Sequence, residues 1–488
     1  MTTIQKPLKK PMHGTSKAKG CSHARLGNFC KMFPKLKSWA EECKITEQCE
    51  AEAVAAAIGG VGGLMHDVRD ESGDSNIPAA YTFFAQFVDH DITLDTTSPL
   101  HGKVPEAEIA KLPNLRSASL DLDCVYGLGP EAMPFMFDST QPGRLLVGSE
   151  VDGVSNPEDV PRNADGRALI GDPRNDENLF ISQMQAAFLK FHNRRLVAAN
   201  FEKAQEETRY HYQYIVLYDF LKRVCHPDIY SFALPKIEQN AKKKGKKNYP
   251  FCDILDGCHR ICMPVEFSVA AYRFGHSLVR SVYPANASYP LIELFDERFG
   301  TLGFGQVPPE LNVDWRYLLD IEDCHPFSKS KKVDELLADE LIRLPDPVVG
   351  RNAATNDRAL AFRNILRGHA LGLASGQAVA KELAAKGYPI KLPADLKFSD
   401  IDNWACLTKG LPCDISKHTP LFLYVMREAA VLGMGQTLGP VGSAILMETF
   451  GTMFVHCDTF LKKSWKPDPC VVRGKDLTLA DFMAYAKG

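Results

Sequence analysis

Apolar residues recur along most of this chain at intervals of three and four positions. The clearest case is Leu179–Ala199, where four large apolar residues follow that spacing: Phe180, Met184, Phe188 and Phe191. This spacing places them on one helical face, so the segment predicts a helix packed against a core. Other predicted helices are Ala51–Ile58, Tyr81–Thr93, Thr208–Cys225, Ser268–Val282, Asp357–Leu373, Gln377–Lys386 and Val441–Phe454. Alternating strand patterns are few and short, which predicts a mainly α-helical fold with long loops and little β structure.

Composition and charge argue against a disordered chain, a nucleic-acid-binding protein and a membrane-spanning protein. The chain has 488 residues, of which 45% are hydrophobic and 24% charged, so it can bury a large core and is not disordered. A net charge of −3 gives no overall basic surface for nucleic acid, despite two short lysine-rich patches. No apolar run approaches the roughly 18 residues of a membrane-spanning helix. We find no internal repeat and no interdomain linker, and therefore expect one domain over residues 58–488.

The first 57 residues differ from the rest in charge. The first forty hold nine Lys or Arg and no acid before Glu41. We expect residues 1–57 to pack on the domain or extend from it, although a targeting or membrane-surface role is an alternative. The basic run Lys242–Lys247 resembles a nuclear-localisation signal, but a solvated loop is the expected structure. The N-terminus lacks the apolar core of a secretory signal, which favours a cytoplasmic protein or a non-classical export route.

The chain has fourteen cysteines, and this number bears on whether the protein resides in a reducing or an oxidising compartment. None lies in a Cys-x-x-Cys pair, and the spacing of Cys252, Cys258 and Cys262 fits neither a zinc ribbon nor a haem-c attachment site. We expect the cysteines to be structural, and some of them to be paired as disulfides if the compartment is oxidising. The cysteine content and the missing signal point in opposite directions, which leaves the compartment open.

Candidate chemistry begins in the predicted helix Tyr81–Thr93. Gln86 and His90 are four residues apart and therefore share a helical face. Asp89 and Asp91 flank His90, about 100° to either side. Three consecutive ionisable residues on a helix otherwise rich in phenylalanine are costly to bury without partners. A half-exposed helix with a polar edge is the structural alternative to a functional site.

A second group of polar residues follows in a short loop. Ser117, Ser119, Asp121 and Asp123 alternate along it and present oxygen atoms. Calcium takes six to eight oxygen ligands, so such a loop suits this cation. Asp91 is a further candidate ligand that would tie the loop to the preceding helix.

These segments together resemble the animal haem peroxidase (peroxidase–cyclooxygenase) family, including its shorter bacterial members. The resemblance runs from about residue 58 to about residue 465 and rests on five motifs in family order: Gln86–Asp91, Gly171–Glu177, Phe274–His276, Asn364–His369 and Leu438–Gly442. It implies a haem peroxidase that reduces hydrogen peroxide and oxidises small organic donors or halides.

The resemblance assigns roles on the distal side of the haem to three residues. His90 corresponds to the distal histidine and Arg174 to the catalytic arginine. Gln86, one turn before His90, is placed to hydrogen-bond peroxide, water or a halide. The residue types suit these roles, since a neutral imidazole can move a proton between peroxide oxygens and a guanidinium can stabilise developing charge.

The resemblance also assigns the residues that hold haem b. His276 corresponds to the iron ligand, with Asn364 accepting a hydrogen bond from its imidazole and Arg367 meeting a propionate. Asp89 and Glu177 occupy positions that form ester links to haem in the family. Because Asn178 stands where myeloperoxidase has a methionine, the sulfonium link of that enzyme is not expected.

The family's calcium site maps onto Asp91, Ser117, the Ser119 carbonyl, Asp121 and Asp123. The mammalian enzymes have threonine in place of Ser117 and serine in place of Asp123, so the coordination here carries an additional carboxylate.

One departure separates classes within the superfamily. Cyclooxygenases and fatty-acid dioxygenases have a radical-forming tyrosine three residues before the proximal histidine, where this chain has Arg273. Tyr272 is one position away and, on a helix, would point about 100° elsewhere. We therefore predict a peroxidase; the alternatives are a haem-dependent fatty-acid oxygenase and a haem-free structural or interaction protein of the same fold.

Overall fold

The computed structural model describes residues 27–70, 72–196, 200–243, 262–296, 301–322, 324–392 and 396–487. Residues 1–26 of the predicted basic segment lie outside the described residues, as do most of the basic run Lys242–Lys247 and two cysteines of the predicted cluster, Cys252 and Cys258.

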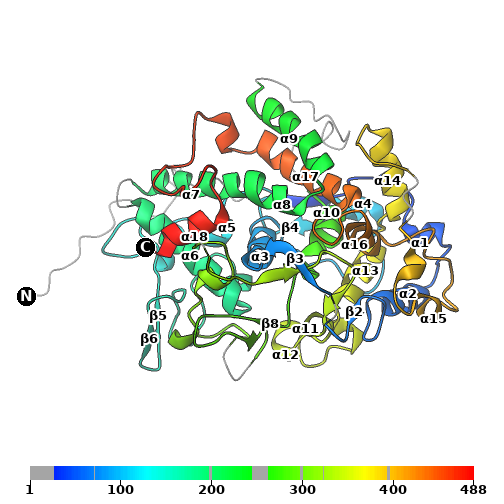
Figure 1. The fold of residues 1–488 in the computed structure, drawn as a ribbon, viewed down its shortest axis with the longest axis horizontal. Coiled ribbons are helices and arrows are strands. Elements are labelled where there is room, and N and C mark those ends of the chain that lie inside the picture. Colours follow the sequence, from blue (N-terminus) through cyan, green and yellow to red (C-terminus); the bar gives the residue numbers. More distant parts are fainter. Residues whose placement is uncertain are drawn as a thin grey trace, which may run out of the picture.

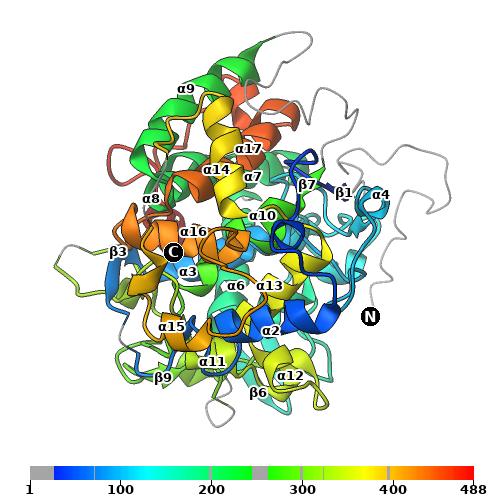
Figure 2. The ribbon, with the colours of Figure 1, turned by 90° about the vertical axis from the view of Figure 1, so that its right-hand side faces the viewer.

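The helix α3 (Ala80–Ile92) lies at the centre of the molecule (Figures 1 and 2). Every residue of α3 except Gln86 is buried. Its apolar residues pack on α6 (Leu179–Leu196): the Phe87 and Phe188 rings stack with centroids 4.2 Å apart, and Phe83 stacks on Phe180 at 4.6 Å. The phenylalanine spacing in both helices therefore produces the central packing contact.

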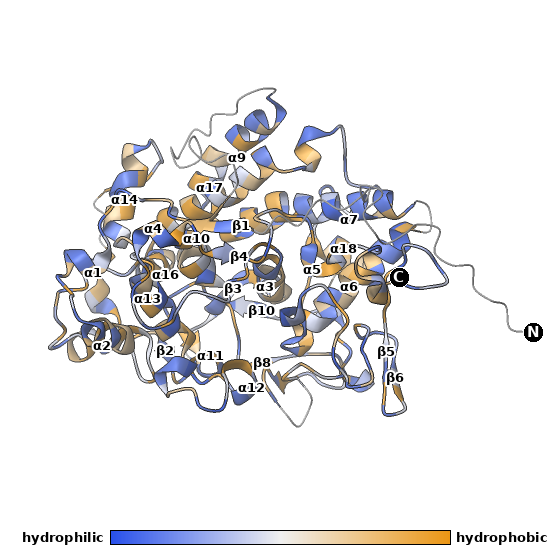
Figure 3. Ribbon diagram, turned by 180° about the vertical axis from the view of Figure 1, so that it is seen from behind, coloured by the Kyte–Doolittle hydropathy of each residue, from blue (hydrophilic) through white to orange (hydrophobic). Residues whose placement is uncertain are grey.

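Further helices surround this pair. Every residue of α17 (Pro440–His456) up to Val455 is buried, and α17 packs on α9 (Pro227–Lys242) and α16 (Leu421–Val431). Coloured by hydropathy, α16 and α17 are mainly apolar, whereas the outer helix α7 (Phe201–Ile215) shows a polar side (Figure 3). Among the described residues, no helix combines the length and the apolar character needed to span a bilayer.

The remaining helices have at most 12 residues each. Those of nine residues or more are α2 (Gln48–Gly59), α13 (Leu360–Ala370), α14 (Gly376–Ala385) and α18 (Leu479–Lys487). Those of four or five residues are α1 (Trp39–Glu42), α4 (Glu106–Ile109), α5 (Asp123–Tyr126), α8 (Leu221–Val224), α10 (Val265–Val269), α11 (Asp339–Ile342), α12 (Asp346–Val349) and α15 (Trp404–Leu407). A π-helical segment, Val216–Phe220, joins α7 to α8.

The β structure is limited to short strands, which together with the helices confirms the predicted mainly α fold. One three-stranded sheet has the order β4-β1-β7, in which β1 runs antiparallel to β4 and parallel to β7. Its strands are β1 (Gly27–Cys30), β4 (Pro113–Asn114) and β7 (Met263–Pro264). The two-stranded pairs are β3 (Asp74–Pro78) with β10 (Lys329–Lys331), β2 (His66–Asp67) with β11 (Leu337–Ala338), β5 (Ser149–Val151) with β6 (Val154–Asn156), and β8 (Val282–Tyr283) with β9 (Ile292–Glu293).

The predicted helix Ser268–Val282 is wrong. The α-helix α10 ends at Val269, and the backbone of Ala270 (φ −129°, ψ −77°) breaks the helical path. A 3₁₀ segment, Ala271–His276, follows, and Val282 already belongs to β8. The apolar spacing was compatible with a helix, but the sequence carried no signal for the break at Ala270.

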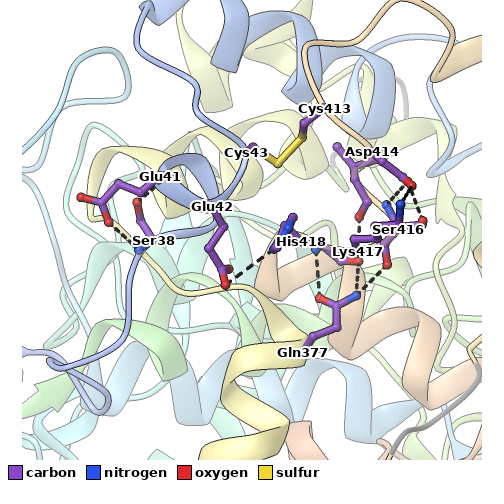
Figure 4. The surroundings of a disulfide bond; sticks show 12 residues. Ser38, Glu41, Glu42, Cys43, Gln377, Cys413, Asp414, Ser416, Lys417 and His418 are labelled. Atoms are coloured by element: carbon purple, nitrogen blue, oxygen red, sulfur yellow. Dashed lines mark hydrogen bonds and ion pairs between the residues drawn. A yellow bond between two sulfur atoms is a disulfide. The ribbon is translucent and has the colours of Figure 1, made fainter.

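Two disulfides tie the start of the described chain to distant segments. Cys30 is bonded to Cys262, and Cys43 to Cys413. The second bond joins the end of α1 to the loop before α16 (Figure 4). An ion pair between Glu42 and His418 lies beside it, with the side-chain atoms 3.6 Å apart. These bonds hold residues 27–57 against the helical core, and disulfides of this kind are typical of oxidising compartments.

We expect loss of the Cys43–Cys413 bond to destabilise the protein. The bond closes a loop of 370 residues, and removal of a native disulfide typically costs about 2–5 kcal/mol. The double variant C43S/C413S should therefore unfold at a lower temperature than the parent protein, as measured by thermal denaturation. C49S, which alters an exposed free cysteine, is the matched control. Equal melting temperatures for the double variant and the parent would contradict a stabilising role.

Candidate active site

A cavity of about 340 Å³ lies beside α3 and the two 3₁₀ segments Pro173–Asp176 and Ala271–His276. This volume is in the range of small-molecule sites. Seven of the predicted site residues line it: Gln86, Asp89, His90, Arg174, Glu177, His276 and Arg367. Segments nearly 280 positions apart in sequence thus meet in one cavity. The eighth, Asn364, lies next to His276.

A chain of hydrogen bonds sets the tautomer of His90. Gln185 donates to the Cys124 carbonyl (3.1 Å), so its oxygen faces Asn175 and accepts from the Asn175 amide (2.8 Å). The Asn175 oxygen therefore faces His90 Nδ1, 2.7 Å away. A carbonyl oxygen only accepts, so Nδ1 carries the proton and Nε2 has a free lone pair. Nε2 lies 3.7 Å from a Glu177 carboxylate oxygen.

The surroundings of His90 keep it neutral. Burial, assisted by the positive charge of Arg174, lowers the pKa of His90 to about 4. Arg174 is held by Asp172 and by the backbone, because its Nη2 donates to Asp172 (2.8 Å), to the His90 carbonyl (3.0 Å) and to the Thr93 carbonyl (2.7 Å). Burial acts to raise the pKa of Asp172, but hydrogen bonds from Arg174 and its charge hold that pKa far below its usual range. At neutral pH the site therefore contains a neutral imidazole beside a fixed guanidinium.

The two carboxylates in the cavity have different environments. Asp89 is engaged at both oxygens, by Arg273 Nη1 (3.0 Å) and by the Thr93 hydroxyl (2.9 Å). Burial acts to raise the pKa of Asp89, but the charges of Arg273 and Arg174 and the hydrogen bond from Thr93 contribute together to a lowered pKa. Glu177 accepts a hydrogen bond from Gln86. Burial raises the pKa of Glu177 to about 7, against the opposing charge of Arg174.

His276 is also neutral. Burial, assisted by the charge of Arg273, lowers the pKa of His276 to about 3. Asn364 Nδ2 lies 3.2 Å from His276 Nδ1. An imidazole that binds iron through Nε2 donates from Nδ1, so iron binding requires the Asn364 amide to be turned with its oxygen toward the ring.

Arg367 lines the same cavity from α13. Its Nη2 donates to Asp95 (3.1 Å) and to the Ser98 hydroxyl (2.6 Å). Its buried Nε has no hydrogen-bond partner within the part of the chain that the structure describes. A buried guanidinium N–H without a partner, on a residue that lines a cavity, is suited to an anionic group such as a carboxylate.

Tyr272 and Arg273 both line the cavity, in a 3₁₀ segment rather than the expected α-helix. The Tyr272 hydroxyl donates to the Ala85 carbonyl of α3 (3.2 Å), and its ring stacks on Phe267 with centroids 4.7 Å apart. Arg273 occupies the position three residues before His276.

The predicted calcium ligands lie close together at the end of α3. The pKa of Asp91 is raised to about 7 by burial and by the charge of Asp123. The pKa of Asp121 is raised well above its usual value by burial and by both of those carboxylates. The Ser117 hydroxyl donates to Asp121 (2.8 Å), and the other Asp121 oxygen is buried without a partner in the described part of the chain. No group of three or more His, Cys, Asp or Glu side chains among the described residues has a metal-binding arrangement.

Comparisons with known proteins point to the same family as the sequence motifs. The family model "Animal haem peroxidase" matches residues 101–290, a segment that includes Arg174, Glu177 and His276. The predicted resemblance to the animal haem peroxidases is confirmed. No curated protein matches the chain.

Solved structures share the fold of this chain. Peroxidase A from Dictyostelium discoideum has a TM-score of 0.53 at 15% identity, covering 90% of this chain and 88% of its own. The fatty acid alpha-dioxygenase of Oryza sativa has a TM-score of 0.57 at 15% identity, covering 93% and 78%. The fatty acid alpha-dioxygenase of Arabidopsis thaliana has a TM-score of 0.56 at 15% identity, covering 92% and 74%. At this identity the likeness concerns the fold.

Sequence reasoning overlooked Asn175 and Gln185. Asn175 lies inside the motif that carries Arg174, and Gln185 follows on the core-facing helix α6, yet neither was assigned a role. Both are fully buried polar side chains. Because burial is invisible in sequence, a polar residue within an apolar helical stripe was the available signal for Gln185.

We expect Asn175 to control the protonation of His90. In the variant N175D a carboxylate would lie about where the amide oxygen now accepts, and its charge should raise the pKa of His90 from about 4 toward its ordinary value. The acid limb of the pH–rate profile for reaction with hydrogen peroxide should move to higher pH in the haem-loaded variant. N76D, at an exposed asparagine, is the matched control. An unshifted acid limb in N175D would contradict this role.

Proposed function

We propose that this chain is a haem peroxidase that reduces hydrogen peroxide and oxidises small organic donors or halides. The observation that carries the proposal is that His90 and His276, both neutral and held by an asparagine at Nδ1, line one cavity together with Arg174. Such a pair of neutral imidazoles suits one metal ligand and one proton acceptor.

The cavity residues fit haem b. His276 would bind the iron through Nε2, with Nδ1 fixed by Asn364. Arg367, whose buried Nε lacks a partner in the described part of the chain, would meet a propionate. Asp89 and Glu177 would be the carboxylates available for ester links. When bound, haem supplies the redox-active iron that accepts and returns electrons.

His90 would move one proton during the reduction of peroxide. Its Nε2 lone pair can take a proton from one peroxide oxygen and return it to the other as the O–O bond breaks. The hydrogen bond from Nδ1 to Asn175 keeps this lone pair directed away from the core. Because the pKa of His90 is about 4, the base form predominates at neutral pH and is lost as pH falls through about 4.

Arg174 would stabilise the charge that develops on peroxide, and Gln86 would orient a small molecule in the cavity. Arg174 is fixed by Asp172 and by two backbone carbonyls, so its charge is in place before peroxide arrives. Gln86 is the one residue of α3 that is not buried, and its amide lines the cavity. It is therefore placed to hydrogen-bond peroxide, water or a halide.

We further propose calcium as a structural cation. Asp91 and Asp123 raise the pKa of Asp121, and Asp123 raises that of Asp91, in a buried region; a divalent cation would relieve that repulsion. Ser117 and the Ser119 carbonyl would complete the oxygen set after a local adjustment, because Ser117 now donates to Asp121.

The alternative of a fatty-acid oxygenase gains one observation from the structure. Tyr272 lines the cavity, and two of the solved structures with this fold are fatty acid alpha-dioxygenases. The Tyr272 hydroxyl, however, is bound to the Ala85 carbonyl, and Arg273 occupies the position three residues before His276. We expect no oxygen consumption with palmitic acid; sustained uptake with formation of a tyrosyl radical would favour the oxygenase.

The variants H90A and H276A separate the two histidines. H90A should retain haem but react with hydrogen peroxide about 10²–10⁴-fold more slowly, because the proton acceptor is lost. H276A should lose haem or show an altered iron spectrum. Absorption spectroscopy and stopped-flow mixing with peroxide measure both effects.

The matched control for these variants is H101A. His101 is a half-exposed surface histidine, with ion-pair distances of 2.9 Å to Glu52 and 3.3 Å to Asp357. It should behave like the parent protein. An H90A variant that reacts with peroxide at the parent rate, or an H276A variant with an unaltered spectrum, would show that the histidines are assigned wrongly.

Removal of calcium should lower thermal stability. Chelation with EGTA removes the cation that offsets the repulsion between the buried carboxylates, so the melting temperature should fall and should recover on adding calcium. The variant D121N should weaken the response to calcium, and D165N, at an exposed aspartate, should not. A melting temperature that is independent of EGTA and calcium, together with no calcium in the purified protein, would refute the calcium site.

A further inference from the structure

A second concave site lies away from the cavity, where the chain between α17 and α18 passes beside α7 (Figure 1). We call it the C-terminal groove; it has a volume of about 590 Å³. Its aromatic lining residues are Tyr214, Tyr218, Phe460 and Trp465. Its charged lining residues are Lys242, Lys463, Lys466, Lys475 and Asp476.

The charges of the C-terminal groove favour an anion. Four lysines and one aspartate line it, in a chain whose net charge is −3. Lys463 is 3.6 Å from Asp458. For Lys242, Lys466 and Lys475 there is no ion-pair partner within the described ranges. An aromatic floor with a cationic rim suits a planar aromatic molecule that carries carboxylate or sulfonate groups.

Trp465 is an oxidisable side chain in the C-terminal groove. It is half-buried, so a molecule in the groove can contact it. Its indole N–H donates to a Glu207 carboxylate oxygen 3.0 Å away. A carboxylate at this position stabilises the positive charge that the indole acquires when it loses an electron.

Aromatic rings connect Trp465 to the cavity. Trp465 contacts the His211 ring at 4.9 Å between centroids. From His211 the ring contacts continue, at centroid distances of 5.3, 4.0, 4.5 and 5.8 Å, through Phe191, Phe482 and Phe188 to Tyr212. The Tyr212 centroid lies 6.1 Å from that of Phe84 on α3.

The chain of rings continues to the cavity wall. Phe84 contacts Phe220 at 5.6 Å, and Phe220 contacts Tyr272 at 6.4 Å. Tyr272 lines the cavity that contains His90 and His276. Three oxidisable residues, Trp465, Tyr212 and Tyr272, thus stand along one continuous run of rings from the groove to the cavity.

From this arrangement we infer that the C-terminal groove is a second site of donor oxidation, for bulky anionic aromatic reductants that are too large for the cavity. The inference rests on the proposed peroxidase function. A donor in the groove gives one electron to oxidised Trp465, which has itself given one electron inward through Tyr212 and Tyr272. Two donor molecules supply the two electrons that, with two protons, convert one hydrogen peroxide in the cavity into two water molecules.

The test compares two donors in haem-loaded protein with hydrogen peroxide. The first is phenol, which is small enough for the cavity, and the second is a disulfonated azo dye. In W465F, kcat for the dye should fall more than about tenfold, while phenol oxidation stays at the parent rate. W404F is the matched control, because Trp404 is also half-buried but lies on α15, at the other end of the molecule from α7 (Figure 1).

A double variant tests the positive charge of the C-terminal groove. K466E/K475E should raise KM for the disulfonated dye and leave KM for phenol unchanged, because only the groove loses attraction for the anion. This variant tests the site even if W465F does not fold. With peroxide and no donor, mass spectrometry should find oxidised Trp465 in the parent protein and unmodified Trp404.

The outcomes separate the two proposals. If phenol is oxidised but W465F and K466E/K475E both treat the dye as the parent does, the groove is not an oxidation site and the peroxidase function stands. If the haem-loaded parent protein oxidises neither donor, the peroxidase function is wrong and the groove proposal fails with it.

Discussion

The hydrogen-bond chain from the Cys124 carbonyl through Gln185 and Asn175 to His90 is the constraint on which the site depends. A histidine buried in an apolar helix bundle is costly unless its ring is neutral and its polar atoms are satisfied. The hydrogen-bond chain meets both needs. The Cys124 carbonyl orients the Gln185 amide, and Gln185 orients the Asn175 amide, so that the Asn175 oxygen faces His90 Nδ1 and Nδ1 carries the proton. What is left is a single unprotonated nitrogen aimed into the cavity.

This constraint explains why the packing of α3 on α6 matters for chemistry. The phenylalanine contacts between these helices hold Gln185 and His90 at a fixed separation, with Asn175 on the 3₁₀ segment between them in the chain. The same burial that lowers the pKa of His90 to about 4 lowers that of His276 to about 3. Structural packing and the protonation state of the site therefore have a common cause.

The parts of the fold and of the site that depend on periodic or local sequence patterns could be predicted from the sequence. The central helices α3, α6, α7 and α17 follow from apolar spacing, and the motif around His90 lies on one of them. The break at Ala270 could not be predicted, because it depends on how the chain enters the cavity wall, and the α-helix expected at Tyr272 is a 3₁₀ segment for that reason. The helices α9, α16 and α18 were not predicted, although their apolar residues favour one face as strongly as those of α3 do. The role of Asn175 depends on its contact with a side chain 85 residues away, which no local pattern reveals.

The central claim is that the cavity binds haem and turns over hydrogen peroxide through His90. The most direct measurement is the absorption spectrum of the haem-supplemented protein before and after hydrogen peroxide, in the parent and in H90A. We predict a Soret band in both, a rapid shift with peroxide that a phenolic donor reverses in the parent, and a shift slowed by about 10²-fold or more in H90A. The absence of a Soret band when haem is freely supplied would contradict the claim, and the interpretation as a haem-free interaction protein would take its place.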